Sequence, residues 1–392
     1  MNRTQRLLLL LGVLAVAGGV LVVRWSRGRE RQQAVTRAGE LVEQGEPELA
    51  LRTVRPFINA GRADGELLVI AAKAYRLLDE PAKALECLDV AASQGYVADV
   101  LDLERGLALA AVRRFAEAVP LLIGSPTKEA AVALASIHLQ LFEMEKALDN
   151  LNTWKQLAPD DPSPYVVAGN VWARANEHET AVEQFRQALE RRADLFEARL
   201  PLANSLAELG NIDEAVELLV ACLEAQPRDP AASLRLATCE VERGNVAAAR
   251  SLLEKLIEAH PHVVPALVEL AKIELDDGNA AAAERLLAEA VSRDPTNDAA
   301  VYNLSLAASR LDRADEAAEL MTRARELKES RRRLADAMDR VNADAADFDA
   351  FCEAGELLAD LGQPQQAASL FSAVLARDPA NARAREGIRR LN

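Results

Sequence analysis

Histidine, cysteine and aromatic residues are all scarce in this chain. Its 392 residues include four histidines and four cysteines, and only 4% are phenylalanine, tyrosine or tryptophan. The sequence contains no HExxH, CxxC or GxSxG motif and no glycine-rich phosphate-binding loop. We therefore expect a protein that is not an enzyme, holds no cofactor or metal and takes no small-molecule substrate. The cysteines stand singly, which is typical of small buried residues, although a Cys222–Cys239 disulfide stays open as an alternative.

Positive charge is also in short supply. Lysine and arginine number 46 against 61 aspartate and glutamate residues, so the formal net charge is −15. Sequence-independent binding of DNA or RNA relies on lysine and arginine contacts to phosphate, and we therefore expect no nucleic-acid partner. Hydrophobic residues make up 50% of the chain. Alanine and leucine supply most of this apolar surface, which suits helices that pack through small contacts.

Alanine recurs along the chain at a nearly constant spacing. Successive members of this column are mostly 34 residues apart, with one spacing of 29 and one of 50. The column comprises Ala50, Ala84, Ala118, Ala147, Ala181, Ala215, Ala249, Ala283, Ala317 and Ala367. A second small residue lies twelve positions before each alanine, and a larger apolar residue lies four positions after it. A fixed period near 34 residues predicts one supersecondary unit that is copied along the chain.

Each period predicts two helices. Between the two small columns stands a residue that tolerates the left-handed conformation in which helices end. These turn residues are Gly45, Asp79, Asn176, Gly210, Gly244, Gly278, Asp312 and Gly362. In several units a proline such as Pro227 or Pro261 follows the second helix, and proline cannot continue a helix. The predicted unit is therefore helix A, a short turn, helix B and a restart.

This arrangement resembles the tetratricopeptide repeat (TPR) family. The resemblance is most complete in residues 162–195, where the closing proline of the family is replaced by Ala193. The positions that match are Tyr165, Gly169, Trp172, Ala181, Phe185 and Ala188. The resemblance implies an all-α, TPR-type α-solenoid, a right-handed superhelix of about ten helix pairs. The units begin near residues 31, 65, 99, 128, 162, 196, 230, 264, 298 and 348.

Two irregularities interrupt the repeat. The unit from residue 99 is five residues short and has Pro120 inside its helix B, which predicts a shortened or bent helix. Sixteen extra residues precede the last unit, so that residues 314–341 are predicted to form one long helix. The expected parts are an anchor at 1–30, three units at 31–127, further units with the long helix at 128–341, and a last unit with a capping helix at 342–392.

A single long hydrophobic run stands near the N-terminus. Residues 7–23 are uncharged and apolar, with Arg3 and Arg6 before them and Arg24 after them. At about 1.5 Å per residue, the run nearly crosses the core of a bilayer. We therefore expect one N-terminal transmembrane helix and a single-pass membrane protein. A signal peptide cleaved near Ala17 is the alternative, and its removal would leave a secreted periplasmic repeat protein.

The flanking charges bear on the side of the membrane that the repeats occupy. The short N-terminal tail with Arg3 and Arg6 resists translocation, which favours repeats on the extracytoplasmic side, whereas the basic residues after the run favour the cytoplasmic side. We expect the extracytoplasmic arrangement. Arginine outnumbers lysine by 38 to 8, which indicates a high-GC genome and hence a bacterial cytoplasmic membrane.

Two rows of residues on helix A form a candidate binding surface. In TPR proteins helix A lines the concave face, and in five consecutive units the residue after the helix A small position is polar. This polar row is Ser136, Asn170, Asn204, Thr238 and Lys272. An apolar row lies four positions earlier and consists of Val132, Val166, Leu200, Leu234 and Val268. Residues four apart share a helix face, so the two rows predict a polar and an apolar track along one groove.

The two tracks suit a protein or peptide partner. Side-chain amides can hydrogen-bond an extended peptide backbone, while an apolar track accepts alternate side chains. The alternative is that the polar row only faces water and the apolar row only packs between helices. We therefore expect a membrane-tethered scaffold that binds an extended peptide or a partner helix, in the assembly of the bacterial envelope. A cytoplasm-facing regulatory adaptor of an envelope-biogenesis enzyme is the alternative function.

Overall fold

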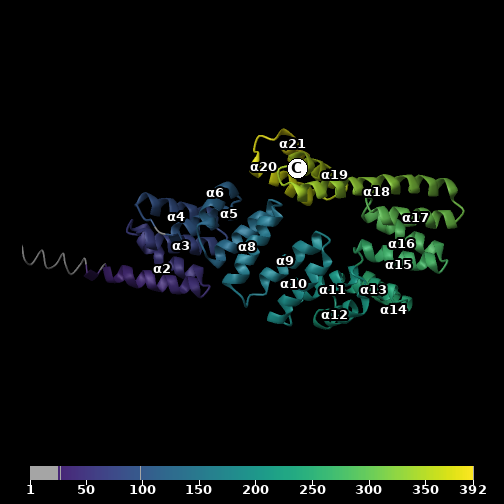
Figure 1. Ribbon diagram of the computed structural model, residues 1–392, viewed down its shortest axis with the longest axis horizontal. Coiled ribbons are helices and arrows are strands. Elements are labelled where there is room, and N and C mark those ends of the chain that lie inside the picture. The colour runs from purple at the N-terminus through teal and green to yellow at the C-terminus, as the bar shows by residue number, and fades with distance from the viewer. Residues whose placement is uncertain (1–24, 27, 98, 392) are drawn as a thin grey trace, which may run out of the picture. The chain divides into compact units, whose positions relative to one another are not determined.

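The computed structural model describes residues 25–26, 28–97 and 99–391, and the chain divides into two compact units after Leu134. The expected anchor at residues 7–23 lies outside the described residues. Among the helices that are described, none is both long enough and apolar enough to span a bilayer. All regular secondary structure in these residues is helical (Figure 1), as the sequence predicts.

Unit 1 contains the first three repeats and the beginning of the fourth. Its first helix covers residues 28–43 of the described chain. The helices that follow are α2 (Pro47–Asn59), α3 (Gly65–Leu77), α4 (Pro81–Ser93), α5 (Asp99–Ala111) and α6 (Phe115–Ile123). Helix α7 (Lys128–Gln140) crosses from unit 1 into unit 2. Helix α6 has nine residues, with Pro120 inside it, which confirms the shortened helix.

Unit 2 continues the same pattern from Ala135 onward. In each repeat helix A packs against helix B, and helix B packs against helix A of the next repeat. The helices are α8 (Met144–Leu157), α9 (Ser163–Arg174), α10 (His178–Arg191), α11 (Phe196–Glu208), α12 (Ile212–Ala225), α13 (Pro230–Glu242), α14 (Val246–Ala259), α15 (Val264–Asp276), α16 (Ala280–Arg293), α17 (Asp298–Arg310), α18 (Ala314–Ala343), α19 (Phe348–Asp360), α20 (Pro364–Arg377) and α21 (Ala382–Leu391).

The observed helices confirm the predicted solenoid of helix pairs. With the helix at 28–43, the described chain holds ten pairs, and each helix A begins within a residue or two of its predicted start where the chain before it is described. The long helix α18 and the final helix α21 also stand where the sequence predicts them. Such a solenoid is stabilised by contacts between neighbouring repeats and has no single central core.

The turn between helix A and helix B has the same backbone conformation in each repeat. All eight predicted turn residues have a positive φ, from 58° at Asp79 to 82° at Gly278. Only glycine adopts this conformation without cost, and asparagine and aspartate tolerate it better than other residues. In the third and fourth repeats, where the sequence offers no such residue, Arg113 and Phe142 occupy it with φ of 61° and 57°.

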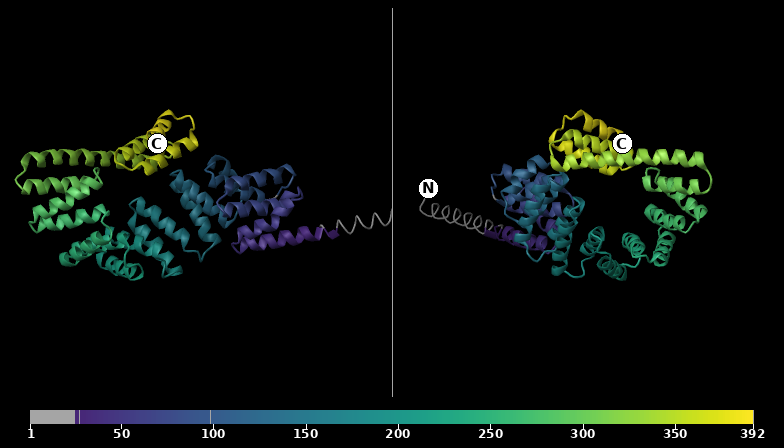
Figure 2. Two further views of the ribbon diagram at one scale, coloured as in Figure 1. Left: turned by 180° about the vertical axis from the view of Figure 1, so that it is seen from behind. Right: turned by 45° about the vertical axis from the view of Figure 1, so that its right-hand side comes forward.

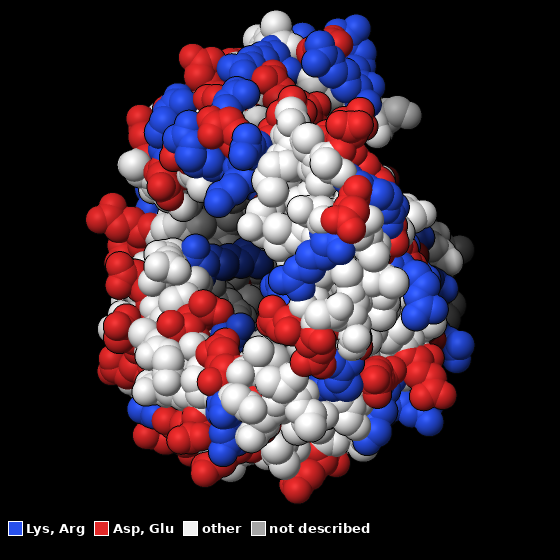
Figure 3. All heavy atoms as spheres, turned by 90° about the vertical axis from the view of Figure 1, so that its right-hand side faces the viewer, with Lys and Arg blue, Asp and Glu red and all other residues white. Residues whose placement is uncertain are grey.

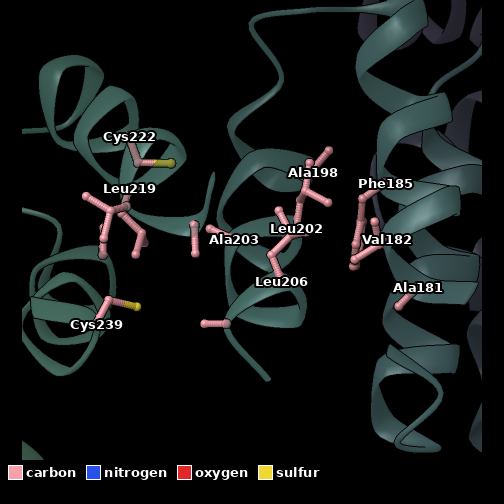
Figure 4. Close-up of a cluster of buried hydrophobic side chains, with 14 of the residues drawn as sticks. Ala181, Val182, Phe185, Ala198, Leu202, Ala203, Leu206, Leu219, Cys222 and Cys239 are labelled. Carbon is pink, nitrogen blue, oxygen red and sulfur yellow. The ribbon is translucent and has the colours of Figure 1, made fainter. Parts of the chain in front are cut away.

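The small columns are buried where helices approach most closely. Figure 4 shows Leu202 and Leu206 of α11 pointing toward Phe185 of α10, while Ala203 on the same helix points toward Leu219 of α12. Helix A is thus covered by the helix B before it and by its own helix B. Its small residue allows the second contact, because a longer side chain at that position would meet the large apolar residue of helix B.

The cysteines are free in the structure, so the Cys222–Cys239 disulfide is not formed. Both residues are buried in the cluster that contains Leu219. Burial raises the pKa of both thiols, because a thiolate is poorly solvated there. Cys222 and Cys239 therefore serve as small buried residues of the interhelix packing, as the sequence indicates.

We predict that Gly169→Ala destabilises the fold through overpacking. A Cβ atom at Gly169 would lie 2.5 Å from Cε1 of Phe185, whose ring is fully buried. The free energy of unfolding should fall by about 1–3 kcal/mol in urea denaturation followed by circular dichroism. The control is Gly39→Ala in the first helix, where no heavy atom lies within 4 Å of the new Cβ. It should stabilise by about 0.5–1 kcal/mol, and an equal loss in both variants would contradict the packing argument.

Candidate partner-binding groove

The inner side of the solenoid in unit 2 is formed by the A helices. Helix A of one repeat contacts helix A of the next, from α9 through α11, α13 and α15 to α17, whereas the B helices make no comparably extensive contacts with one another. Neighbouring elements lie closer together on the inside of a curve than on its outside, so the side of the A helices is concave. The teal-to-green helices in Figure 2 follow this curve.

The polar row lies on the accessible side of these helices. Ser136 and Asn170 are exposed, and Asn204, Thr238 and Lys272 are partly exposed. The residue just before each of them is the buried small residue that contacts helix B. Consecutive helix residues point about 100° apart, so the polar row faces away from that contact and toward the concave side. The structure therefore brings Asn170, Asn204, Thr238 and Lys272 onto one surface, and Ser136 lies exposed on α7 at the start of unit 2.

The amides of this row are free to bind a ligand. Within the described residues, the side chains of Asn170 and Asn204 make no hydrogen bond, and Arg235 donates to the backbone carbonyl of Asn204 instead of to its amide. The other members are engaged locally: the Thr238 hydroxyl donates to the carbonyl of Arg235 at 2.8 Å, and the Lys272 ammonium donates to Glu269 at 2.7 Å. Asn170 and Asn204 thus offer the unused donors and acceptors of the row.

The apolar row is shorter than the sequence predicts. Val166, Leu200 and Leu234 are partly exposed beside the polar row. Val132 is also partly exposed, but it belongs to the portion of α7 that lies in unit 1. Val268 is only 3% exposed, because it packs in the cluster formed by α15, α16 and α17. The part of the apolar track that a partner can reach in unit 2 therefore runs from α9 to α13.

Tyr302 is a groove residue that the sequence analysis did not identify. It lies on α17, thirty-four residues after Val268 and hence at the next position of the same row, and it is 45% exposed. The period alone could have identified it. An exposed tyrosine offers a large apolar face and a hydroxyl that can donate or accept a hydrogen bond, which is a combination enriched where proteins bind partners. Tyr302 therefore extends the apolar row beyond the gap at Val268.

Arg235 is a second groove residue that the sequence analysis did not identify. It precedes Thr238 by one helical turn, and its guanidinium donates to the Asn204 carbonyl at 3.2 Å and to the Glu208 carboxylate at 2.7 Å. Its buried Nε atom has no hydrogen-bond partner in the described chain. Arg235 therefore joins α13 to α11 beside Asn204, and its charge is paired with that of Glu208.

The surface has no large region of one charge in the view of Figure 3. Lysine and arginine side chains alternate there with aspartate and glutamate, and the surface is hollowed near the middle of that view. Elsewhere in the described chain, charges of neighbouring repeats form pairs such as Arg186–Glu214 at 2.7 Å and Arg235–Glu208 at 2.7 Å. Pairing of this kind favours recognition by individual contacts over attraction by a strong field of one sign.

A separate hollow of about 370 Å³ lies between α8, α9 and α10. Trp172, Asp149, Lys155 and Gln184 are among its lining residues. The Lys155 ammonium donates to Gln184 at 2.6 Å and lies 4.7 Å from the centre of the Tyr165 ring. Burial and the nearby Arg191 lower the pKa of Lys155. In the described part of the chain, no group of three or more histidine, cysteine, aspartate or glutamate residues is placed to hold a metal ion.

The sequence matches two family models, each described as "Tetratricopeptide repeat". One matches residues 173–231, 206–273 and 274–341, and the other matches residues 352–388. Together these ranges span more than half of the chain. No curated protein matches the sequence.

Solved structures with a similar arrangement share little sequence with this chain. YrrB, described as "a TPR protein with an unusual peptide-binding site", is 20% identical, with a TM-score of 0.37 over 46% of this chain and 92% of its own. MamA from Desulfovibrio magneticus RS-1 is 22% identical, with a TM-score of 0.38 over 43% and 96%. The human IFIT1 dimer with PPP-AAAA is 17% identical, with a TM-score of 0.42 over 88% and 89%. These likenesses concern the fold alone.

We predict that the free amides contribute nothing to stability. The double variant Asn170→Ala with Asn204→Ala should change the free energy of unfolding by less than about 0.5 kcal/mol, because neither side chain bonds to the protein. Arg235→Ala should lose about 1 kcal/mol, since it removes the bonds to Asn204 and Glu208. Urea denaturation of the three proteins measures both values. A large loss in the double amide variant would mean that these residues support packing.

Proposed function

Because this chain belongs to the tetratricopeptide repeat family, we propose that it is a scaffold that binds a protein partner along the A helices of unit 2. The observation that carries the proposal is the pair of unused amides, Asn170 and Asn204, at equivalent positions of two consecutive repeats on the concave side. A repeated array of one donor and one acceptor per helix suits a ligand that is itself repetitive. A polypeptide backbone is such a ligand.

The spacing of the repeats favours an extended segment. Packed helices lie about 8–10 Å apart, and an extended chain rises about 3.3 Å per residue. One repeat therefore corresponds to about three residues of an extended peptide. The partly exposed Val166, Leu200 and Leu234 lie one helical turn from the polar row and would receive side chains from one face of that peptide.

A partner helix is the second candidate occupant of this groove. Tyr302 and the apolar row provide an apolar surface of the kind that an amphipathic helix covers. A helix, however, satisfies its own backbone hydrogen bonds and would leave the amides of Asn170 and Asn204 without backbone partners. We therefore favour the extended peptide.

We further propose that the N-terminal run tethers the scaffold to a bacterial cytoplasmic membrane, with the repeats on the extracytoplasmic side, where they take part in envelope assembly. The support is the uncharged run at residues 7–23 and the short basic tail before it. In this proposal the scaffold catalyses no reaction itself, and any reaction of envelope assembly is catalysed by its partner. The cytoplasm-facing adaptor is the alternative that the orientation test separates.

We predict that Asn170→Ala with Asn204→Ala weakens binding of the partner. The partner is first isolated by affinity capture from membranes with the wild-type chain, and its affinity is then measured by calorimetric titration. The double variant should lose about 1–3 kcal/mol of binding free energy, because each hydrogen bond contributes roughly 0.5–1.5 kcal/mol. The matched control removes two exposed amides from B helices, Asn152→Ala with Gln366→Ala, and should bind as wild type. Equal affinity of all three proteins would eliminate the groove as the binding site.

We predict that a phosphatase that works only outside the cytoplasm is active when it is fused after residue 392. The full-length fusion should also sediment with membranes. Deletion of residues 1–30 should leave a folded, soluble and inactive fusion, because it removes only residues 28–30 of the first repeat helix, which covers 28–43. An inactive full-length fusion that still sediments would instead support the adaptor that faces the cytoplasm. A truncated fusion that sediments in high salt would reveal a second membrane contact.

A further inference from the structure

The long helix α18 displaces the last repeat from the regular stack. It has 30 residues, whereas helix B of the preceding repeat, α16, has 14. At about 1.5 Å per residue, the extra length carries the next helix pair about 24 Å along the axis of α18. Ala317 and Met321, which hold column positions that are buried in other repeats, are partly exposed for this reason. The helices α19 and α20 pack instead against Ala337 and Val341 near the far end of α18.

The displaced repeat meets the turn between α7 and α8. Arg377, at the end of α20, donates to the backbone carbonyl of Leu141, from which it is separated by 236 residues, and lies 3.4 Å from the Glu143 carboxylate. The Phe142 ring packs edge-on against Phe351 of α19, with ring centres 5.4 Å apart and an angle of 85°. The Arg377 guanidinium lies 5.7 Å from the centre of the Phe351 ring. We name these contacts of Phe142, Glu143, Phe351 and Arg377 the clasp.

The clasp closes unit 2 into a ring. Each helix from α8 to α20 contacts the next, and α20 returns to the turn before α8. Figures 1 and 2 show the yellow C-terminal helices reaching the chain near α8. Away from this seam, the Thr296 hydroxyl between α16 and α17 donates to the carbonyl of Leu361 at 3.0 Å and joins the displaced repeat to the regular stack. The A helices that carry the polar row lie on the inner side of this ring.

Phe142 occupies a position where its residue type is locally unfavourable. Its φ of 57° is the left-handed turn conformation, which eight of the ten repeats fill with glycine, aspartate or asparagine. In this conformation a bulky side chain clashes with its own backbone, and phenylalanine has no side-chain hydrogen bond that could compensate. Arg113 takes the same conformation in unit 1 without touching a distant repeat, whereas the ring of Phe142 packs against Phe351. The contact with Phe351 therefore distinguishes this turn from the others.

The closure is held by few contacts compared with those between neighbouring repeats. The Arg377 Nη1 atom is buried without a hydrogen-bond partner, which opposes closure. The Glu143 carboxylate is shared between Arg377, Lys146 at 3.2 Å and the buried His138 at 2.6 Å. Burial raises the pKa of Glu143, but hydrogen bonds from His138 and Lys146 outweigh burial and keep the pKa low, so the carboxylate stays charged. Opening the clasp separates Phe142 from the core cluster of the last repeat but leaves the contacts between neighbouring repeats in place.

We propose that the clasp gates the concave groove, so that unit 2 exchanges between a closed ring and an open solenoid and a bulky ligand reaches the polar row only in the open form. The proposal deepens the proposed function, since it concerns access to the same groove. When two forms are in equilibrium, the apparent association rate and affinity of a ligand are proportional to the fraction of molecules that are open. The packing of each repeat is the same in both forms.

The test measures access to the groove without any partner. In the full-length chain, Asn170→Cys places an exposed thiol in the groove, and its reaction with N-ethylmaleimide is compared with its reaction with a maleimide that carries a long polyethylene glycol chain. Three native cysteines are buried, and burial raises the pKa of the fourth, Cys87, to about 11, so background labelling is slow. In the closed ring the bulky reagent should react about tenfold more slowly, relative to the small one, than with the same thiol in urea.

Phe142→Gly should open the ring without disturbing the turn, because glycine prefers the conformation found there. The rate with the bulky reagent should rise about fivefold or more, the rate with the small reagent should stay the same, and the radius of gyration from X-ray scattering should increase. Arg377→Met should act in the same direction by removing the guanidinium. The matched control is Arg113→Gly in unit 1, which relieves the same backbone conformation but touches no clasp residue. It should change neither rate.

Two results would overturn the proposal. Equal relative rates for the bulky reagent in the folded and urea-unfolded parent would show that the ring does not restrict the groove. Unchanged labelling and scattering in both clasp variants would show that the clasp does not hold the ring closed. Neither result depends on a partner. A failure of the clasp can therefore be distinguished from a failure of the groove, which the Asn170→Ala with Asn204→Ala titration reports by itself.

Discussion

The close approach of helix A and helix B is the contact on which the rest of the structure depends. At Gly169 there is no room for a Cβ atom beside the Phe185 ring, so the distance between the two helices is set by a single hydrogen atom in place of a side chain. The same contact recurs in nearly every repeat, with small residues facing a buried apolar side chain. Because each copy has the same geometry, the copies stack with a constant small rotation and the solenoid curves.

The concave groove follows from this packing. Helix A uses one side for its own helix B and another for the preceding helix B, as α11 does with α12 and α10. The remaining stripe faces inward. Its apolar residues Val166 and Leu200 also pack against the helices, but the amide side chains of Asn170 and Asn204 bond to nothing in the described chain. Positions such as Asn170 and Asn204 can therefore carry side chains that suit a ligand without lowering the stability of the fold. Val268 marks the limit of this freedom, since tighter packing around α15 removes it from the surface.

The last repeat packs on the long helix α18 as other repeats pack on their shorter neighbours, and the length of α18 brings this repeat to the other end of unit 2. The additional turns of α18 leave the packing of the last repeat intact but move it away from its neighbour and toward the turn between α7 and α8. There Phe142 has an unfavourable backbone conformation, and its ring packs against Phe351. Strong contacts between adjacent repeats and a small clasp between distant ones allow a ring that can open while each repeat stays folded.

The sequence by itself determined the repeats, their turns and the long helix, because the period of the small residues reports contacts between neighbours in the chain. It also placed Asn170 and Asn204 on the accessible side of helix A, and the period extends to Tyr302. Only the tertiary structure decided that Val268 is buried and that Arg377 reaches Leu141. Those outcomes depend on rotations that accumulate over many repeats and on how each neighbour covers a side chain, and neither leaves a periodic pattern in the sequence.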